Sequence, residues 1–143
     1  MNYWLMKSEP SVFGIDHLAR SPRQTAAWDG VRNYQARNML RDRFRAGDRA
    51  FFHHSSCEEP GIYGTMEVAR AGHPEPADAR WTQVEVRLLE RFAHPVTLAT
   101  LREHERGELR SLVVLRRGNR LSITPVTPGE WKFIHRLARK ASA

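Results

Sequence analysis

Cysteine is nearly absent from this sequence, and that scarcity limits what the chain can be. The single thiol, Cys57, cannot form an internal disulfide, so we expect a reducing, cytoplasmic location. No apolar run approaches the roughly 20 residues that a membrane-spanning helix needs. The first ten residues lack the basic and apolar segments of a signal peptide, so none is expected.

Glycine motifs that bind nucleotides are missing as well. The 9 glycines form neither a G-x-G-x-x-G sequence nor a Walker loop, and no G-x-S-x-G elbow surrounds a serine. Lysine is scarce, with 3 residues against 20 arginines. Basic residues still outnumber acidic ones by 23 to 16, which gives a net charge of +7. This balance favours a polyanionic partner such as nucleic acid.

The residues that are present are typical of one α+β domain that covers residues 1–143. The hydrophobic fraction of 41% is enough for an ordinary core. Apolar runs predict strands at residues 2–7, 49–54, 62–68, 82–92 and 121–126. Helices are expected at 15–20, 33–44, 97–104 and from 127 onward, with Asn33, Thr97 and Thr127 as N-caps. Residues 21–30 and 71–80 are expected to be loops, and 109–115 fits a helix or a strand. Since no regular strand–helix–strand unit recurs, we expect a small, mostly antiparallel β-barrel with flanking short helices.

The segment FFHHSSCEEP, residues 51–60, gathers the residue types that catalysis and metal binding use. His53 and His54 are adjacent on a predicted strand and therefore point to opposite faces, so too few ligands converge for a metal site. Glu58 and Glu59 follow Cys57 directly and would raise its pKa, which disfavours a reactive thiolate. We therefore predict no catalytic residue, no metal and no cofactor. An enzyme that uses Cys57 on a nucleobase or small metabolite is kept as an alternative.

Small polar groups stand next to aromatic residues at several predicted element ends. They occur at residues 7–9, 28–38, 53–56 and 116–122. Such groups can hydrogen-bond a flat heterocycle while an aromatic ring stacks on its face. Trp28 is expected in a polar loop, where it would serve as a stacking wall. The basic residues nearby predict phosphate contacts at Arg37, Arg41, Arg116 and Arg117.

Four motifs along residues 2–138 resemble the EVE domain family, which belongs to the PUA-like superfamily. They are YWLMKSEP (3–10), WDGVRNYQARN (28–38), HSSCEEPGIYG (54–64) and RRGNRLSITPV (116–126). The resemblance implies a PUA-like barrel related to YTH domains, without established catalytic activity. It also implies a binding module that holds a flipped, modified base, above all a modified cytosine in DNA, in an aromatic-lined pocket.

The resemblance also implies which residues form the pocket. They are Lys7, Ser8, Glu9, Trp28, Arg32, Asn33, His54, Ser55, Asn119, Arg120 and Leu121. Position 56 is often Asn in relatives, so Ser56 changes any hydrogen bond made there. The expected partner is nucleic acid, with modified DNA preferred and RNA possible. An RNA-binding module of the PUA-like type is the other alternative.

Overall fold

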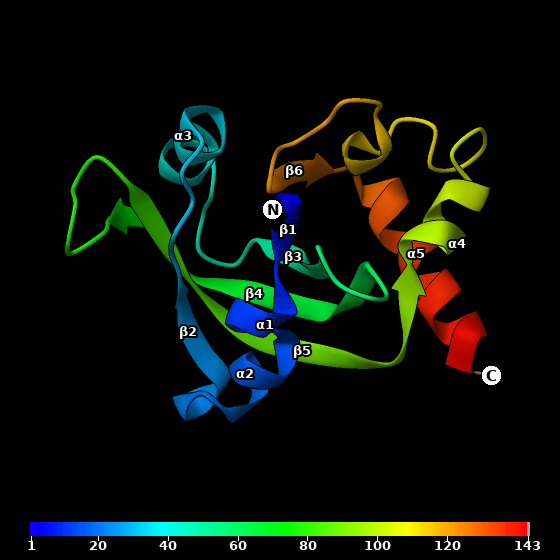
Figure 1. Ribbon diagram of the computed structural model, residues 1–143, viewed down its shortest axis with the longest axis horizontal. Helices are drawn as coiled ribbons and strands as arrows, with labels where there is room; N and C mark the ends of the chain where they lie inside the picture. The colour runs from blue at the N-terminus through cyan, green and yellow to red at the C-terminus, as the bar shows by residue number, and fades with distance from the viewer. Residues whose placement is uncertain (143) are drawn as a thin grey trace.

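The computed structural model describes the backbone of residues 1–142 and the side chains of residues 1–140. A six-stranded sheet runs through the centre, with the strand order β2-β5-β4-β3-β1-β6 (Figure 1). The strands are β1 (Tyr3–Ser8), β2 (Thr25–Trp28), β3 (Arg49–His54), β4 (Gly61–Pro74), β5 (Thr82–Thr97) and β6 (Ile123–Val126). Strands β1 and β3 pair in parallel, and the other described pairs are antiparallel.

Short helices connect these strands. They are α1 (Pro10–Phe13), α2 (Ile15–Arg20), α3 (Tyr34–Asp42), α4 (Leu98–Glu103) and α5 (Pro128–Ser142), with the 3-10 turns η1 (Pro22–Gln24) and η2 (Val113–Leu115). The predicted α+β class is confirmed. The sheet is open rather than a closed barrel, because the terminal strands β2 and β6 each pair with one neighbour only. Within the described residues, no helix is long and apolar enough to cross a membrane.

The sheet separates two apolar cores because side chains alternate along each strand. Trp4 and Met6 of β1 and Phe52 of β3 join the first core, which α2 and α3 cover. Leu5 and Phe51 point the other way into the second core, beneath α4, η2 and α5. Each fully buried apolar side chain of this kind contributes about 1.5–3 kcal/mol to the free energy of unfolding.

Three predicted helix caps are confirmed. Asn33 Oδ1 accepts a hydrogen bond from the Ala36 amide at 3.0 Å, and Thr97 Oγ1 accepts one from the Thr100 amide at 3.1 Å. Thr127 and Glu130 cap each other at the start of α5, with distances of 2.8 and 3.1 Å between backbone amides and side-chain oxygens. Caps depend on neighbouring residues alone, so the local sequence identifies them.

The loop prediction for residues 21–30 is wrong. This segment contains η1 and the four-residue strand β2, which pairs with β5 from Thr25 opposite Arg87 to Trp28 opposite Val84. The segment 71–80 is also partly strand, because β4 continues to Pro74. For residues 109–115, the sequence left open a helix or a strand. The structure has neither over the whole segment, because only residues 113–115 form a 3-10 turn.

Candidate functional site

Two cavities open near the ends of β1 and β3, and Lys7 lines both. The first, named here the Trp28 pocket, has a volume of about 680 Å³ and lies between the end of β1, helix α1 and the loop from Asp29 to Asn33. Predicted pocket residues that line it are Lys7, Ser8, Glu9, Trp28, Arg32, Asn33 and Arg120. The structure thus brings together residues from three of the four sequence motifs.

The floor of the Trp28 pocket is aromatic. Trp28 ends β2 and is only 5% exposed, so it lies in the sheet, and the prediction that it lies in a polar loop is wrong. Its ring makes edge contacts with Phe13 at 6.1 Å and with Phe52 at 5.2 Å between centroids. These neighbours cover most of the indole, so it forms part of a packed floor. Its stacking against a ligand stays a prediction.

The rim of the Trp28 pocket is apolar on one side and polar on the other. Val12 of α1 is 75% exposed and borders the cavity. Ser8 donates its hydroxyl hydrogen bond to the Phe13 carbonyl at 2.7 Å, which joins β1 to α1. Glu9 and Asp29 place exposed carboxylates at the opening. The rim therefore offers both hydrogen-bond acceptors and an apolar contact.

A buried carboxylate holds the polar loop in place. Glu75, 7% exposed, accepts hydrogen bonds from Arg32 Nη1 at 2.7 Å, from Arg32 Nη2 at 2.9 Å and from the Gly30 amide at 3.2 Å. The hydrogen bonds from Arg32 hold the pKa of Glu75 below its ordinary value. Gly30 has φ +77°, a left-handed conformation that favours glycine at this turn. No local pattern predicts this contact, because Glu75 lies 43 residues after Arg32.

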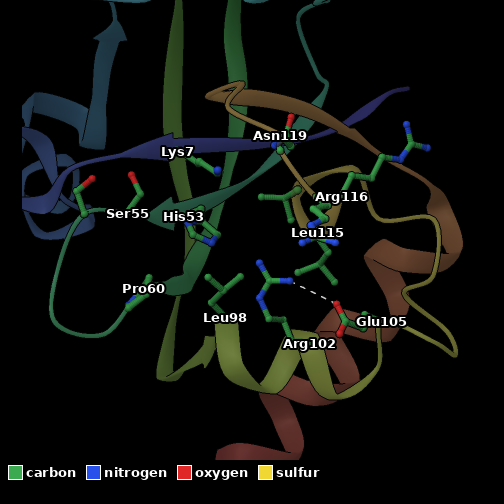
Figure 2. A pocket seen from close by; sticks show the side chains of 14 residues that line it. Lys7, His53, Ser55, Pro60, Leu98, Arg102, Glu105, Leu115, Arg116 and Asn119 are labelled. Atoms are coloured by element: carbon green, nitrogen blue, oxygen red, sulfur yellow. Dashed lines mark hydrogen bonds and ion pairs between the residues drawn. The ribbon is translucent and has the colours of Figure 1, made fainter.

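The second cavity, named here the His53 pocket, has a volume of about 600 Å³ and lies on the side of the sheet that α4 covers (Figure 2). Its walls come from β1, β3, α4 and the segment from Val114 to Asn119. Predicted site residues that line it are Lys7, Ser55, Arg116, Arg117 and Asn119. The predicted single site is therefore divided between two cavities.

His53 lines this second cavity in place of the predicted His54. His53 is 2% exposed, and neither ring nitrogen has a partner among the described side chains and backbone. Burial, followed by the nearby charge of Lys7, lowers the pKa of His53 to about 4. The ring is therefore neutral near pH 7 and offers one donor and one acceptor.

His54 points to the other face and lines neither cavity. Its Nε2 accepts a hydrogen bond from the Ile15 amide at 3.1 Å, and its ring stacks on Tyr63 with centroids 4.0 Å apart. Burial lowers the pKa of His54 as well. The prediction that the two histidines face opposite sides is confirmed, and the assignment of His54 to a base pocket stays a prediction.

The turn after Arg117 distributes its residues among three environments. Gly118, with φ +77°, makes the turn possible. Asn119 enters the His53 pocket with its amide Nδ2 buried and unpartnered, while Arg120 lines the Trp28 pocket. Leu121 packs against the first core and lines neither cavity, and its assignment to the pocket stays a prediction.

Comparison with known proteins fits this architecture. The model of the EVE domain family matches residues 2–137. The chain belongs to the EVE domain family. Mouse thymocyte nuclear protein 1 is 38% identical over 164 residues, which cover 93% of this chain and 72% of that protein. The resemblance inferred from the four motifs is confirmed.

Solved structures share the same fold. Human THYN1, in complex with DNA that contains 5-methylcytosine, is 36% identical, has a TM-score of 0.87, and is matched over 96% of this chain and 98% of that chain. A protein of Pseudomonas syringae is 38% identical with a TM-score of 0.87, over 95% of this chain and 99% of that chain.

The arginines predicted to contact phosphate differ in what already engages them in this EVE domain. Arg41 pairs with Asp42 at 2.8 Å on the surface. Arg37 donates to the Arg80 carbonyl at 2.6 Å and lies over the Tyr34 ring at 4.9 Å. Arg116 and Arg117 are exposed and have no ion-pair partner among the described residues.

Cys57 lies outside both cavities and is half-buried. In the part of the chain that the structure describes, no three His, Cys, Asp or Glu side chains gather as metal ligands would. His53 lies in one of the polar segments noted in the sequence but was not predicted as a pocket residue, and neither was Arg102 on α4. No local sequence pattern predicts that His53 and Arg102 line this cavity, because their positions depend on how α4 packs on the sheet.

Proposed function

We propose that this EVE domain is a non-catalytic DNA-binding module that reads a modified cytosine in the Trp28 pocket. The observation that carries the proposal is the human THYN1 structure, solved in complex with 5-methylcytosine-containing DNA, which matches 96% of this chain at a TM-score of 0.87. In this chain the Trp28 pocket supplies the aromatic floor and the mixed rim that such a base requires.

The chemistry of the rim fits cytosine. Its exocyclic amino group is a hydrogen-bond donor, and carboxylates are suitable acceptors for it. Glu9 and Asp29 provide such carboxylates at the opening. Lys7, Arg32 and Arg120 can donate to the acceptor atoms of the ring. A methyl group at C5 would be favoured beside Val12 and Phe13, because burying one such group contributes about 0.8 kcal/mol.

The energy balance requires these polar contacts. Extruding a base from a duplex costs a few kcal/mol, and stacking a base on an aromatic ring returns about 1–3 kcal/mol. Hydrogen bonds to the base edge and contacts to phosphates must supply the rest. Arg116 and Arg117, which lack ion-pair partners among the described residues, are better placed for phosphate binding than Arg41, which pairs with Asp42.

The test is a comparison of binding affinities by fluorescence anisotropy. Duplexes of one sequence would carry cytosine, 5-methylcytosine or 5-hydroxymethylcytosine at a single position. We expect 5-methylcytosine to bind about fourfold tighter than cytosine, the equivalent of one buried methyl group. Glu9→Gln should weaken binding of the methylated duplex about tenfold, because it replaces a charged carboxylate, which only accepts hydrogen bonds, with a neutral amide that both donates and accepts.

The matched control is Glu108→Gln, which makes the same change at an exposed glutamate outside both pockets. It removes one negative charge as Glu9→Gln does, but should not weaken DNA binding. Equal affinity for all three duplexes, unchanged by Glu9→Gln, would refute the proposal. Tighter binding of a matched RNA than of any DNA would favour the PUA-like RNA-binding alternative instead.

A further inference from the structure

The His53 pocket holds buried polar groups for which the fold provides no partner. Both ring nitrogens of His53 and the Nδ2 of Asn119 are unpartnered among the described residues. An unsatisfied buried polar group destabilises the folded state, so folded proteins rarely keep several together without a use. His53 and Asn119 border a cavity, although these three nitrogens themselves have almost no solvent-accessible surface.

The charge in this cavity is strongly one-sided. Lys7, Arg102, Arg116 and Arg117 line it, against the single carboxylate of Glu105. Among the described residues, the Glu105 carboxylate forms one ion pair, with Arg102 at the long distance of 3.4 Å (Figure 2). Lys7 has no acidic partner within the described residues, and burial together with the charge of Arg102 lowers its pKa. An anion bound between these groups would relieve their mutual repulsion.

The remaining lining defines the shape of a ligand. The hydroxyls of Ser55 and Ser56 add donors, so donors greatly exceed acceptors. Leu98 and Leu115 add an apolar wall that an anion alone would not need. Ser56 has φ +53°, a strained conformation of the kind that proteins retain at binding sites. A volume of about 600 Å³ lies within the usual range for small-molecule sites.

We propose that the His53 pocket is a second binding site, separate from the Trp28 pocket, for a phosphate ester of nucleotide size. Lys7 and Arg102 bind the phosphate (Figure 2). Arginine suits this role because its planar donors match phosphate oxygens. The body of the ligand lies against Leu98 and Leu115, where a turn of the His53 and Asn119 side chains toward the cavity would bring their nitrogens within hydrogen-bond reach.

Two sources could supply this phosphate ester. One is a free mononucleotide. The other is a nucleotide of a DNA strand whose neighbouring base enters the Trp28 pocket, because Lys7 lines both cavities. The chemistry of recognition is the same for both sources, and the site goes beyond the base reading proposed above.

The experiment titrates the full chain with adenosine 5′-monophosphate, adenosine and inorganic phosphate. Affinity comes from calorimetry, and location comes from the ring signals of His53 in NMR spectra, assigned through their loss in His53→Gln. We expect the monophosphate to shift the His53 signals and to bind at least about tenfold tighter than adenosine, since charge-assisted hydrogen bonds dominate the affinity.

Arg102→Gln should weaken binding of the monophosphate about tenfold or more, through loss of a charged donor. Arg106→Gln is the matched control, because Arg106 is exposed on the segment after α4 and lines neither pocket. The proposal is overturned if the monophosphate does not saturate, if adenosine binds as tightly, or if Arg102→Gln changes nothing.

Adding a duplex with 5-methylcytosine separates the two sources. A fall in the affinity for the monophosphate would place a nucleotide of the strand in the His53 pocket, and an unchanged affinity would indicate a free ligand; both outcomes support the site. Glu9→Gln should leave monophosphate binding intact. Monophosphate binding therefore tests the second site, and the effect of Glu9→Gln on duplex binding tests base reading in the Trp28 pocket, so the two proposals can fail independently.

Discussion

Adjacent residues on a strand can have unrelated roles, as His53 and His54 show. Strand alternation predicts that they face opposite sides, and the structure confirms it. Alternation cannot say which side carries a cavity, because that depends on how α4 and the 116–119 segment pack on the sheet. Nε2 of His54 accepts a hydrogen bond from the Ile15 amide, whereas neither ring nitrogen of His53 has a partner among the described residues.

Stability should decrease in mild acid because of His53. Its pKa is about 4 in the folded chain and near 6.5 when unfolded, so the unfolded state binds more protons between these values. Stability is therefore fully present above about pH 6.5 and is lost as pH falls toward 4. From pH 7 to pH 5 the loss from this group is about 2 kcal/mol. Urea unfolding at the two pH values measures it.

The variant His53→Gln isolates the contribution of this group, since glutamine does not titrate. Other groups change between pH 7 and pH 5 in both proteins, so the difference between their pH dependences reports on His53 alone. Identical dependences would show that His53 is readily protonated in the folded chain.

Trp28 is mainly a core residue, because its side chain is almost fully buried in the first core. Trp28→Ala should lower the free energy of unfolding by about 3–5 kcal/mol, because it removes a buried indole that contacts Phe13 and Phe52. Val12→Ala, on the exposed rim of the same pocket, should change it by less than about 0.5 kcal/mol. Chemical denaturation measures both. A small effect of Trp28→Ala would mean that the ring is not packed as described.

At the scale of elements, features set by neighbouring residues are predictable from the sequence, and pairings between distant segments are not. Asn33, Thr97 and Thr127 cap helices through contacts within three residues, so sequence alone predicts them. Strand β2 escaped prediction because TAAW is short and weakly patterned, and its partner β5 lies about 60 residues further on. Pairing with β5 stabilises a segment whose own sequence does not specify a strand.

Glu75 joins two elements that frame the Trp28 pocket, and its removal should loosen the loop there. Glu75→Gln breaks the ion pair with Arg32 and weakens the hydrogen bond from the Gly30 amide. We expect hydrogen exchange at Gly30 to accelerate about tenfold or more, as loss of a hydrogen bond to a charged acceptor predicts. Glu85→Gln, which breaks the surface pair with Arg70, is the control and should leave Gly30 unchanged. An unaltered exchange rate in Glu75→Gln would contradict this role.

At the scale of the whole molecule, the four motifs converge as the sequence suggested, but around two cavities. Lys7 marks the division, since it lines both. Motif order along the chain identified the family, and nine of the eleven pocket residues that it implied line one of the two cavities. It could not show the division, because the sheet face on which each loop packs is a property of the tertiary structure.

The net charge of +7 should make DNA binding strongly dependent on salt. Plots of log K against log salt concentration lose about 0.9 in slope for each phosphate contact removed. We expect Arg116→Gln and Arg117→Gln each to reduce the slope by about this amount, and Arg41→Gln by less because of its pair with Asp42. Equal reductions for Arg116→Gln and Arg41→Gln would show that the surface pairing does not govern phosphate contact.

The crystal structure of this chain with a duplex that contains one 5-methylcytosine tests the central claim most directly. The account predicts a methylated base outside the helix, in the Trp28 pocket, with its amino group facing Glu9 or Asp29. A methylated base that stays stacked in the duplex, or that enters any other cavity, would contradict the account.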